Sequence, residues 1–319
     1  SGTDDIVITG MSGRFPMSDT IDEFARNLFE SRDMITDDHN RWPKDLFNIN
    51  PRMGTIGSCD RFDATFFGQL GADLMDPQIR MLLEVVYEAI VDAVKIKASN
   101  ICLGLHPQQI RGTNTGVYLG CTAPGGADGL PEDVEPDLTN SANVITQDAM
   151  GHMRGIFPNR ISFVYDLLGP SIQCDTACSS SLSSFALAFN DMLLGNVDKA
   201  IVCGTNFGLQ PIMYQCQQAL GVCSPRGVSA PFDAEADGYV KADAVCAVLL
   251  QRRPEARRVY ATVNTVRLNA EGTKMDGMYR PSSDAQESLM RCAYTDAGID
   301  PSRLSYAELH CAGTQVRFL

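Results

Sequence analysis

Short apolar runs typical of β-strands alternate with helix-like segments along most of this chain. The pattern predicts strands at residues 6–9, 115–120, 200–204, 244–250 and 259–266. It predicts helices at residues 21–28, from Pro77 after the cap Asp76, directly after Cys178, and at residues 285–297 before Gly298. Strands that alternate with helices indicate an α/β protein with largely buried sheets.

Composition limits the class of protein. Of the 319 residues, 44% are hydrophobic and 20% are charged, as in a globular protein with one large domain or two halves that share a core. The formal net charge of −13 argues against nucleic acid or an anionic membrane as the main partner. The 11 cysteines are an odd number and form no paired C-x-x-C motifs, and no apolar run approaches the roughly 20 residues that span a bilayer. With no signal peptide at the polar N-terminus, we expect a cytoplasmic protein without a metal site.

Two long stretches lack the periodicity of helices and strands. Residues 122–140 and 208–237 contain repeated glycine, proline and acidic residues, and we predict that both are loops. Loops of this length in a compact domain are usually functional or disordered. The basic turn at residues 252–257 is the predicted internal boundary.

Cys178 lies where an apolar, strand-like stretch meets an amphipathic helix. Five apolar residues at steps of three and four define the expected buried face of that helix: Leu182, Phe185, Ala186, Phe189 and Leu193. The partial positive charge at a helix N-terminus favours a thiolate over a thiol, so a cysteine there can attack carbonyl groups. A cysteine chosen at random is more often a small buried hydrophobe. Its position, and not its type, therefore makes Cys178 a candidate nucleophile.

His310 is the second candidate. It follows an apolar-leaning, strand-like stretch and precedes a turn of small residues. An imidazole at such a strand end can donate a hydrogen bond to a carbonyl oxygen or move a proton, and the alternative is a histidine bonded to nearby backbone. None of the four histidines has a metal-ligating partner at i+3 or i+4, which argues against a metal site.

A series of motifs resembles β-ketoacyl synthases, the condensing domains of fatty acid and polyketide synthases. Residues 175–181, Asp-Thr-Ala-Cys-Ser-Ser-Ser, are similar to the nucleophile motif of that family. Further similar blocks follow in family order at residues 10–16, 62–68, 75–78, 159–162, 168–171, 231–234 and 236–239. The detail of residues 83–92 and 258–262 most resembles animal type I fatty acid synthase or related animal polyketide synthases.

The resemblance implies a thiolase-like α/β fold, in which two related halves stack as five layers (αβαβα), and a homodimer. Residues 1–250 would be the N-terminal half that carries the nucleophile, and residues 257–319 would begin the C-terminal half that carries the first catalytic histidine. The implied activity is a decarboxylative Claisen condensation with malonyl- or methylmalonyl-acyl carrier protein. The implied partners are acyl carrier protein and other domains of a synthase. No cofactor binds directly, because phosphopantetheine arrives on the acyl carrier protein.

The resemblance also assigns roles to residues. Cys178 would accept the acyl group, its own amide N–H would bind the oxyanion, and His310 would stabilise the enolate oxygen. Thr314 matches a threonine that hydrogen-bonds the pantetheine arm. Ala312 stands where the family usually has a second hydroxyl for that arm, and the loss of one such contact costs about 0.5–1.5 kcal/mol.

The chain departs from the family pattern in three places. Cys311-Ala312 replaces the usual Gly-Thr after the first histidine, and the bulk of Cys311 predicts backbone strain. Ala242-Asp243-Ala244 replaces the usual Gly-Glu-Gly. The chain ends at Leu319, before the lysine, second histidine and glycine-rich loop of the family, which predicts an incomplete second half.

Three functions stay open at this stage. The first is a ketosynthase within a longer synthase. The second is a truncated or degenerate, non-catalytic ketosynthase that serves as a dimerisation or carrier-protein-binding module, which the three departures favour. The third is a thiolase or acyltransferase on the same fold, which the Thr-Ala-Cys-Ser-Ser-Ser block disfavours.

Overall fold

One mixed β-sheet forms the centre of the molecule. The computed structural model describes residues 4–39, 41–44, 48–69, 72, 75–93, 107–122, 153, 155–274 and 281–314. Its strands are β1 (Ile6–Arg14), β2 (Thr115–Cys121), β3 (Ser171–Cys174), β4 (Lys199–Asn206), β5 (Ala244–Arg252) and β6 (Ala261–Thr262). Its α-helices are α1 (Ile21–Phe29), α2 (Pro77–Asp92), α4 (Ile156–Tyr165), α5 (Ser180–Leu194), α6 (Pro211–Ala219) and α7 (Ser283–Ala297).

The sheet combines a parallel half with an antiparallel half. The strand order is β3-β2-β4-β5-β1-β6. Strand β2 pairs in parallel with β3 and β4, whereas β5 runs antiparallel to β4 and β1, and β6 is antiparallel to β1. Gly120 of β2 pairs with both Cys174 and Gly204, so the carboxyl ends of three parallel strands lie together at one edge. Ligands of open α/β sheets commonly bind at such an edge.

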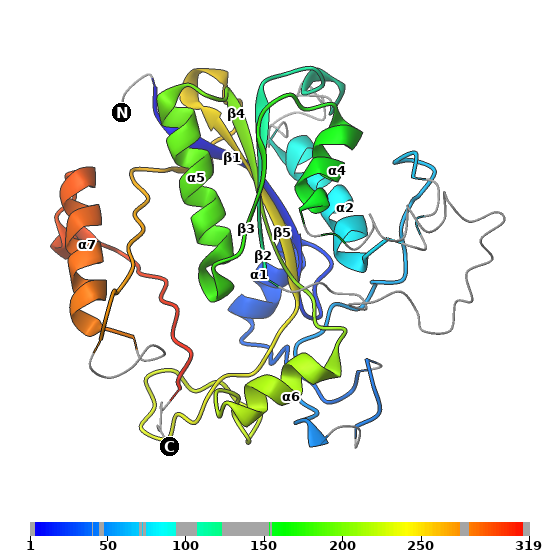
Figure 1. Cartoon of the computed structure of the whole chain (residues 1–319), viewed down its shortest axis with the longest axis vertical. Coiled ribbons are helices and arrows are strands. Elements are labelled where there is room, and N and C mark those ends of the chain that lie inside the picture. The colour runs from blue at the N-terminus through cyan, green and yellow to red at the C-terminus, as the bar shows by residue number, and fades with distance from the viewer. Residues whose placement is uncertain are drawn as a thin grey trace.

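Helices cover both faces of the sheet. Helices α2 and α4 lie against one face and α5 lies against the other, while α7 lies apart from the sheet beyond α5 (Figure 1). Side chains alternate between two cores: Val117, Leu119 and Ile201 face α2 and α4, whereas Tyr118 and Val202 face α5. The described residues therefore form one sheet between two helical layers, which is three layers of the expected five-layer fold.

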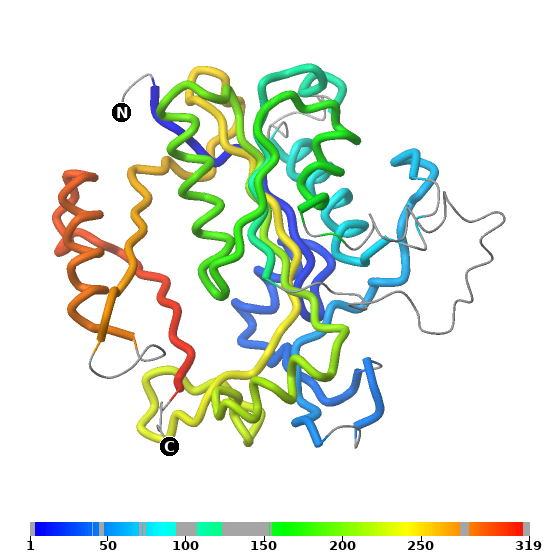
Figure 2. The backbone as a smooth tube through the Cα atoms, in the orientation of Figure 1, coloured from blue at the N-terminus to red at the C-terminus, as the bar shows by residue number. Residues whose placement is uncertain are grey.

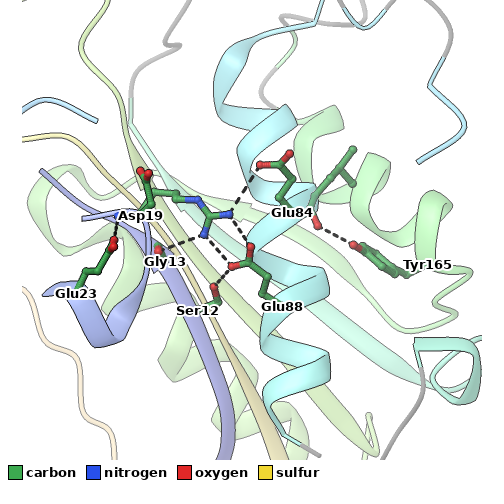
Figure 3. Close-up of polar contacts among 9 residues, drawn as sticks. Ser12, Gly13, Asp19, Glu23, Glu84, Glu88 and Tyr165 are labelled. Atoms are coloured by element: carbon green, nitrogen blue, oxygen red, sulfur yellow. Dashed lines mark hydrogen bonds and ion pairs between the residues drawn. The ribbon is translucent and has the colours of Figure 1, made fainter. Parts of the chain in front are cut away.

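A charged cluster joins α2 to β1 (Figure 3). Arg14 donates hydrogen bonds of 2.8 and 2.6 Å to the two carboxylate oxygens of Glu88, and Ser12 also donates to Glu88. The Arg14 guanidinium lies 3.9 Å from Glu84. Burial raises the pKa of Glu84, and Arg14 opposes that effect.

Strand β1 and helix α2 also approach closely at Gly10. A Cβ on Gly10 would lie 2.0 Å from a backbone oxygen of α2, so glycine is needed at this contact.

Most of the expected elements are confirmed. Asp76 caps α2 and accepts the Gln78 N–H at 2.8 Å, and Gly298 ends α7 with a φ of 61°. Residues 6–9 belong to a longer strand, because a β-bulge between Ile8 and Gly10 lets β1 continue.

Two expectations at the level of elements are wrong. The predicted loop at residues 208–237 contains helix α6. The predicted strand at residues 259–266 pairs only at Ala261–Thr262. The Val263 N–H still donates to the Ile6 carbonyl, but Ile6 is the first residue of β1, so the residues after Val263 run past the start of that strand. The part of residues 122–140 after Thr122 lies outside the described residues, and the division at residues 250–257 stays a prediction.

No helix in the described part of the chain is both long and apolar enough to cross a membrane.

Candidate active site

Glycines at the strand ends allow α5 to begin close to the sheet. A Cβ on Gly120 would lie only 2.4 Å from the Ser181 nitrogen, and a Cβ on Gly204 would lie 3.1 Å from the Ser181 Cβ. Real Cβ atoms do not approach backbone as closely as the first distance, so Gly120 cannot be replaced without movement of the helix. The N-terminus of α5 is thereby held at the carboxyl ends of β2 and β4.

Cys178 lies in the turn between β3 and α5. It is in a 3₁₀ turn, Ala177–Ser179, and its side chain is exposed. Ala177 has a φ of 54°, in the left-handed region that residues other than glycine rarely adopt. Such strain is often found beside reactive groups, and here it turns the chain sharply from strand to helix. The sequence-predicted position of Cys178 before a helix is confirmed.

Hydroxyl groups hold this turn in place. Ser180 Oγ accepts the Thr176 N–H at 3.0 Å and donates to the Ala177 carbonyl at 2.6 Å. Ser179 Oγ donates to the Thr176 carbonyl at 2.8 Å. Thr122, which follows β2, also donates to the Ala177 carbonyl at 3.2 Å. The serines and threonines of the motif therefore fix the backbone that presents the thiol.

Cys178 and His310 line the same cavity. The cavity has a volume of about 540 Å³, and Ala312 and Cys311 also line it. Tyr239 and the segment that follows it line the cavity as well. The structure thus places three of the four predicted site residues, Cys178, His310 and Ala312, around one space.

The segment that carries His310 is attached to the loop after α6. The Gly238 N–H donates to the Gly313 carbonyl at 3.0 Å, and Figure 2 shows the last described segment reaching that loop. Gly238 has a φ of 128°, and a Cβ there would lie 2.6 Å from the Val222 carbonyl oxygen. Gly238 therefore joins both segments in a conformation that favours glycine.

Thr314 lies outside the Cys178 cavity. It lines a neighbouring cavity of about 890 Å³, together with Ala236, Asp237 and Val222. The structure does not bring Thr314 into the same space as Cys178, and its role stays a prediction.

The strain expected at Cys311 is absent. Cys311 is not among the described residues with positive φ, and the left-handed conformation falls on Gly313, at a φ of 63°. The prediction of strain beside His310 was wrong because Gly313, two positions later, supplies the turn.

Asp243 supplies a carboxylate at the centre of the altered Gly-Glu-Gly block. Its side chain is only 1% exposed and forms a 2.6 Å ion pair with Arg41, which is 4% exposed. It also accepts the N–H groups of Ile56 at 3.1 Å and Gly208 at 2.9 Å. Burial raises the pKa of Asp243, while Arg41 and the two N–H donors oppose that effect. Asp243 thus joins the segments of Arg41, Ile56 and Gly208 to its own.

Ala242 also fits its place. Gly54 lies opposite this segment, donates its N–H to the Lys241 carbonyl at 2.9 Å, and accepts the Asp243 N–H at 2.9 Å. A Cβ on Gly54 would lie 2.8 Å from the Ala242 Cβ. Glycine at residue 54 therefore leaves the space that the methyl group of Ala242 occupies.

Sequence reasoning missed Lys241 as a residue of this cavity. Lys241 and Tyr239 both line it, three and five residues before the last alanine of the altered block. Burial lowers the pKa of Lys241, and Cys223, Cys178 and Asp243 partly oppose that effect. Burial also raises the pKa of Tyr239 to about 12. The Gly-Tyr motif identified the segment, but nothing in its local pattern indicated that it faces Cys178.

Within the described residues, no three His, Cys, Asp or Glu side chains come together as a metal site. None of the ten cysteines that the structure describes forms a disulfide.

Two family models match this chain. The model described as "Beta-ketoacyl synthase, N-terminal domain" matches residues 3–256, and the model described as "Beta-ketoacyl synthase, C-terminal domain" matches residues 260–317. Together they extend over both the Cys178 segment and the His310 segment.

Similar proteins include fatty acid and polyketide synthases. A fatty acid synthase of Anser anser anser is 38% identical over 315 residues, which are 98% of this chain and 85% of that protein. The lovastatin nonaketide synthase, polyketide synthase component, of Aspergillus terreus (strain NIH 2624 / FGSC A1156) is 34% identical over 97% of this chain and 10% of that protein.

A solved structure shares the fold. The ketosynthase from module 6 of the bacillaene synthase from Bacillus subtilis 168 superposes with a TM-score of 0.83 and 31% identity. The match covers 98% of this chain and 52% of that chain. This chain therefore spans about half the length of the solved ketosynthase and a tenth of the fungal synthase.

Proposed function

Because this chain belongs to the β-ketoacyl synthase family, we propose that it takes part in decarboxylative condensation during fatty acid or polyketide elongation. The observation that carries this proposal is that Cys178 and His310 line one cavity. The fold is thiolase-like, as in the solved ketosynthases. The expected enzyme is a condensing acyltransferase that works as part of a multidomain synthase.

The first step is acyl transfer to Cys178. The thiolate attacks the carbonyl carbon of an acyl thioester, a new C–S bond forms, and the donor thiolate leaves. The start of α5 supports this step, because the first N–H groups of a helix lack intrahelical partners and can donate to the oxyanion. The exposed position of Cys178 gives the donor access.

The second step is condensation. The bond between the malonyl carboxylate and its α-carbon breaks, carbon dioxide leaves, and the electron pair remains as an enolate. The enolate carbon attacks the acyl-Cys178 carbonyl, a C–C bond forms, and the Cys178 thiolate is released. A hydrogen bond from His310 to the enolate oxygen stabilises the charge as it develops.

The proposed donor of both acyl units is acyl carrier protein, which delivers them on phosphopantetheine. Ala312 lines the Cys178 cavity and Thr314 lines the neighbouring one. An extended arm that passes between these positions would reach the thiol, and Thr314 would donate its hydroxyl to that arm. Among the described residues no two cysteines form a disulfide, which is consistent with a reducing compartment such as the cytoplasm.

We also propose a homodimer formed at strand β3. Among the described residues, strand β3 is the last strand of the sheet, and it pairs with β2 on one side only. All four of its residues are only partly buried. Exposed strand edges commonly pair with a second strand, and a second copy of β3 would cover this one.

The acylation step is tested directly on Cys178. We expect that the chain, incubated with acetyl-N-acetylcysteamine, gains the mass of one acetyl group that hydroxylamine removes. Cys178→Ala should gain none, whereas Cys216→Ala, which removes another exposed thiol, should react as the wild type does. Absence of the adduct on correctly folded wild-type chain would refute the proposal.

A further inference from the structure

Lys241 places a positive charge beside the nucleophile. The residue lines the cavity that Cys178 and His310 share. Cys178 and Lys241 therefore border the same space. The acylation and condensation steps above make no use of this charge.

The backbone around Lys241 is held on both sides. The Lys241 carbonyl accepts the Gly54 N–H at 2.9 Å, and the Val240 N–H donates to Ser229 Oγ at 2.9 Å. One residue earlier, Tyr239 forms two backbone hydrogen bonds with Val222 and Ser224. Lys241 is therefore presented by an ordered segment, as a group with a specific role requires.

The Lys241 ammonium has no carboxylate partner among the described residues. The carboxylate two positions later, Asp243, is bound to Arg41 at 2.6 Å and to two backbone N–H groups. The contact of Lys241 is with the ring of Tyr214, whose centroid lies 5.1 Å away. Burial lowers the pKa of Lys241, as expected for a cation that has lost water without gaining an anion.

A half-buried cation that lacks an anionic partner can bind an anionic ligand. Burial of a charge costs free energy unless a partner compensates it, so an anionic ligand in this cavity recovers part of that cost. A carboxylate also suits an ammonium in geometry and charge. Cys178, which accepts the acyl group in the proposed reaction, lines the same cavity. The anion expected beside Lys241 is therefore a carboxylate on an acyl thioester.

We propose that Lys241 is a specificity residue, whose ammonium binds the carboxylate of acyl donors of the malonyl class in the Cys178 cavity. The identity of the donor rests on the proposed condensation, but the anion preference of the cavity does not. Lys241 acts by attracting and orienting the charged donor, and it forms no bond with it.

The test compares a charged and a neutral reagent of similar size at the same thiol. Rates of Cys178 alkylation by iodoacetate and by iodoacetamide are measured by peptide mass spectrometry for wild type, K241M and K241R. We expect that K241M lowers the iodoacetate rate, relative to the iodoacetamide rate, by about tenfold, and that K241R restores most of it. In the wild type, the ratio of the iodoacetate rate to the iodoacetamide rate should fall as salt is added, because salt screens the attraction of the ammonium for the anion.

The matched control is K44M, which removes the same charge from an exposed lysine paired with Asp37 at 3.3 Å. It should leave the ratio of the two rates unchanged. A purely structural role of Lys241 would change both rates together, and an unchanged ratio in K241M would overturn the proposal. Because alkylation needs no acyl donor, this result is independent of whether acetyl-N-acetylcysteamine acylates Cys178.

Discussion

Asp243 and Lys241 lie two positions apart in the sequence, but their charged groups have different kinds of neighbour. Asp243 is enclosed by an arginine and two N–H donors, whereas Lys241 meets an aromatic ring. A buried carboxylate with such partners holds segments together, and an unpaired ammonium reduces stability. Charges that are retained at a cost to stability are often functional.

Removal of the Asp243 charge should destabilise the fold strongly. In Asp243→Asn, Arg41 keeps its buried charge without a carboxylate partner, so we expect a loss of about 3–5 kcal/mol in the free energy of unfolding. The matched variant is Asp33→Asn, whose pair with Arg52 at 2.7 Å is on the surface, and we expect a loss of about 1 kcal/mol or less there. Urea unfolding measures both, and equal losses would contradict the assigned role of Asp243.

Removal of the Lys241 charge should have the opposite sign near neutral pH. Burial lowers the pKa of Lys241 below its ordinary value of 10.5, so the folded state releases this proton more readily than the unfolded state does. Above the lowered pKa the unfolded chain binds more protons at this site, and wild-type stability therefore gains as pH rises toward 10.5. K241M should unfold at higher urea than wild type at about pH 7, and by a smaller margin at about pH 10. A constant margin at both pH values would contradict this explanation.

At the scale of elements, the approach of α5 to the sheet decides where the nucleophile lies. Gly120→Ala puts a methyl group against the Ser181 backbone, where only 2.4 Å separates the atoms. We expect a loss of about 1–3 kcal/mol in stability, and roughly 100-fold slower acylation of Cys178 if the helix start moves by about 1 Å. The control is Gly57→Ala, because a Cβ there meets nothing within 4 Å. Urea unfolding and the rate of adduct formation are the two measurements, and unimpaired acylation in Gly120→Ala would refute the positioning argument.

The periodicity of α5 predicted the helix but only part of its buried face. Ala186 and Phe189 are buried as expected, whereas Leu182 and Leu193 are exposed. The helix packs with small side chains such as Ser184, because it lies very close to the strand glycines. A hydrophobic pattern identifies bulky residues that can be buried, and it misses a contact made by serine and glycine.

The candidate site shows the same limit. Motifs indicated Cys178 and His310, because each is marked by its own neighbours in the sequence. The neighbours of Lys241 in the sequence form no such motif. Its position depends on backbone hydrogen bonds between its segment and Gly54, which is distant in the sequence. Contacts between distant segments carry no local signal, so the sequence predicted the reacting groups and missed the charge beside them. Helix α6 was also missed, because glutamines interrupt the spacing of apolar residues by which a helix is recognised.

At the scale of the whole molecule, the two edges of the sheet differ. At one edge the two-residue strand β6 pairs with β1. At the other edge, within the part of the chain that the structure describes, the four-residue strand β3 has one side without a partner strand. Exposed apolar side chains precede and flank β3, among them Leu168 and Phe163. An open strand beside apolar surface is the arrangement that a second copy can cover in a two-fold symmetric contact.

A charge beside β3 should therefore dissociate the homodimer. Leu168 lies three residues before the start of β3 and is 69% exposed. We expect Leu168→Asp to weaken dimerisation by about 2 kcal/mol, or roughly 30-fold in the dissociation constant. Leu28→Asp is the matched control, because Leu28 is 54% exposed but lies on α1, which packs against β1 near the other edge of the sheet. Sedimentation velocity over a range of concentrations measures the dissociation constant for wild type and both variants. A wild-type chain that stays monomeric at every concentration would refute the dimer. A dimer that Leu28→Asp weakens as much as Leu168→Asp would show that β3 is not its contact, because only the residue beside the open strand should matter.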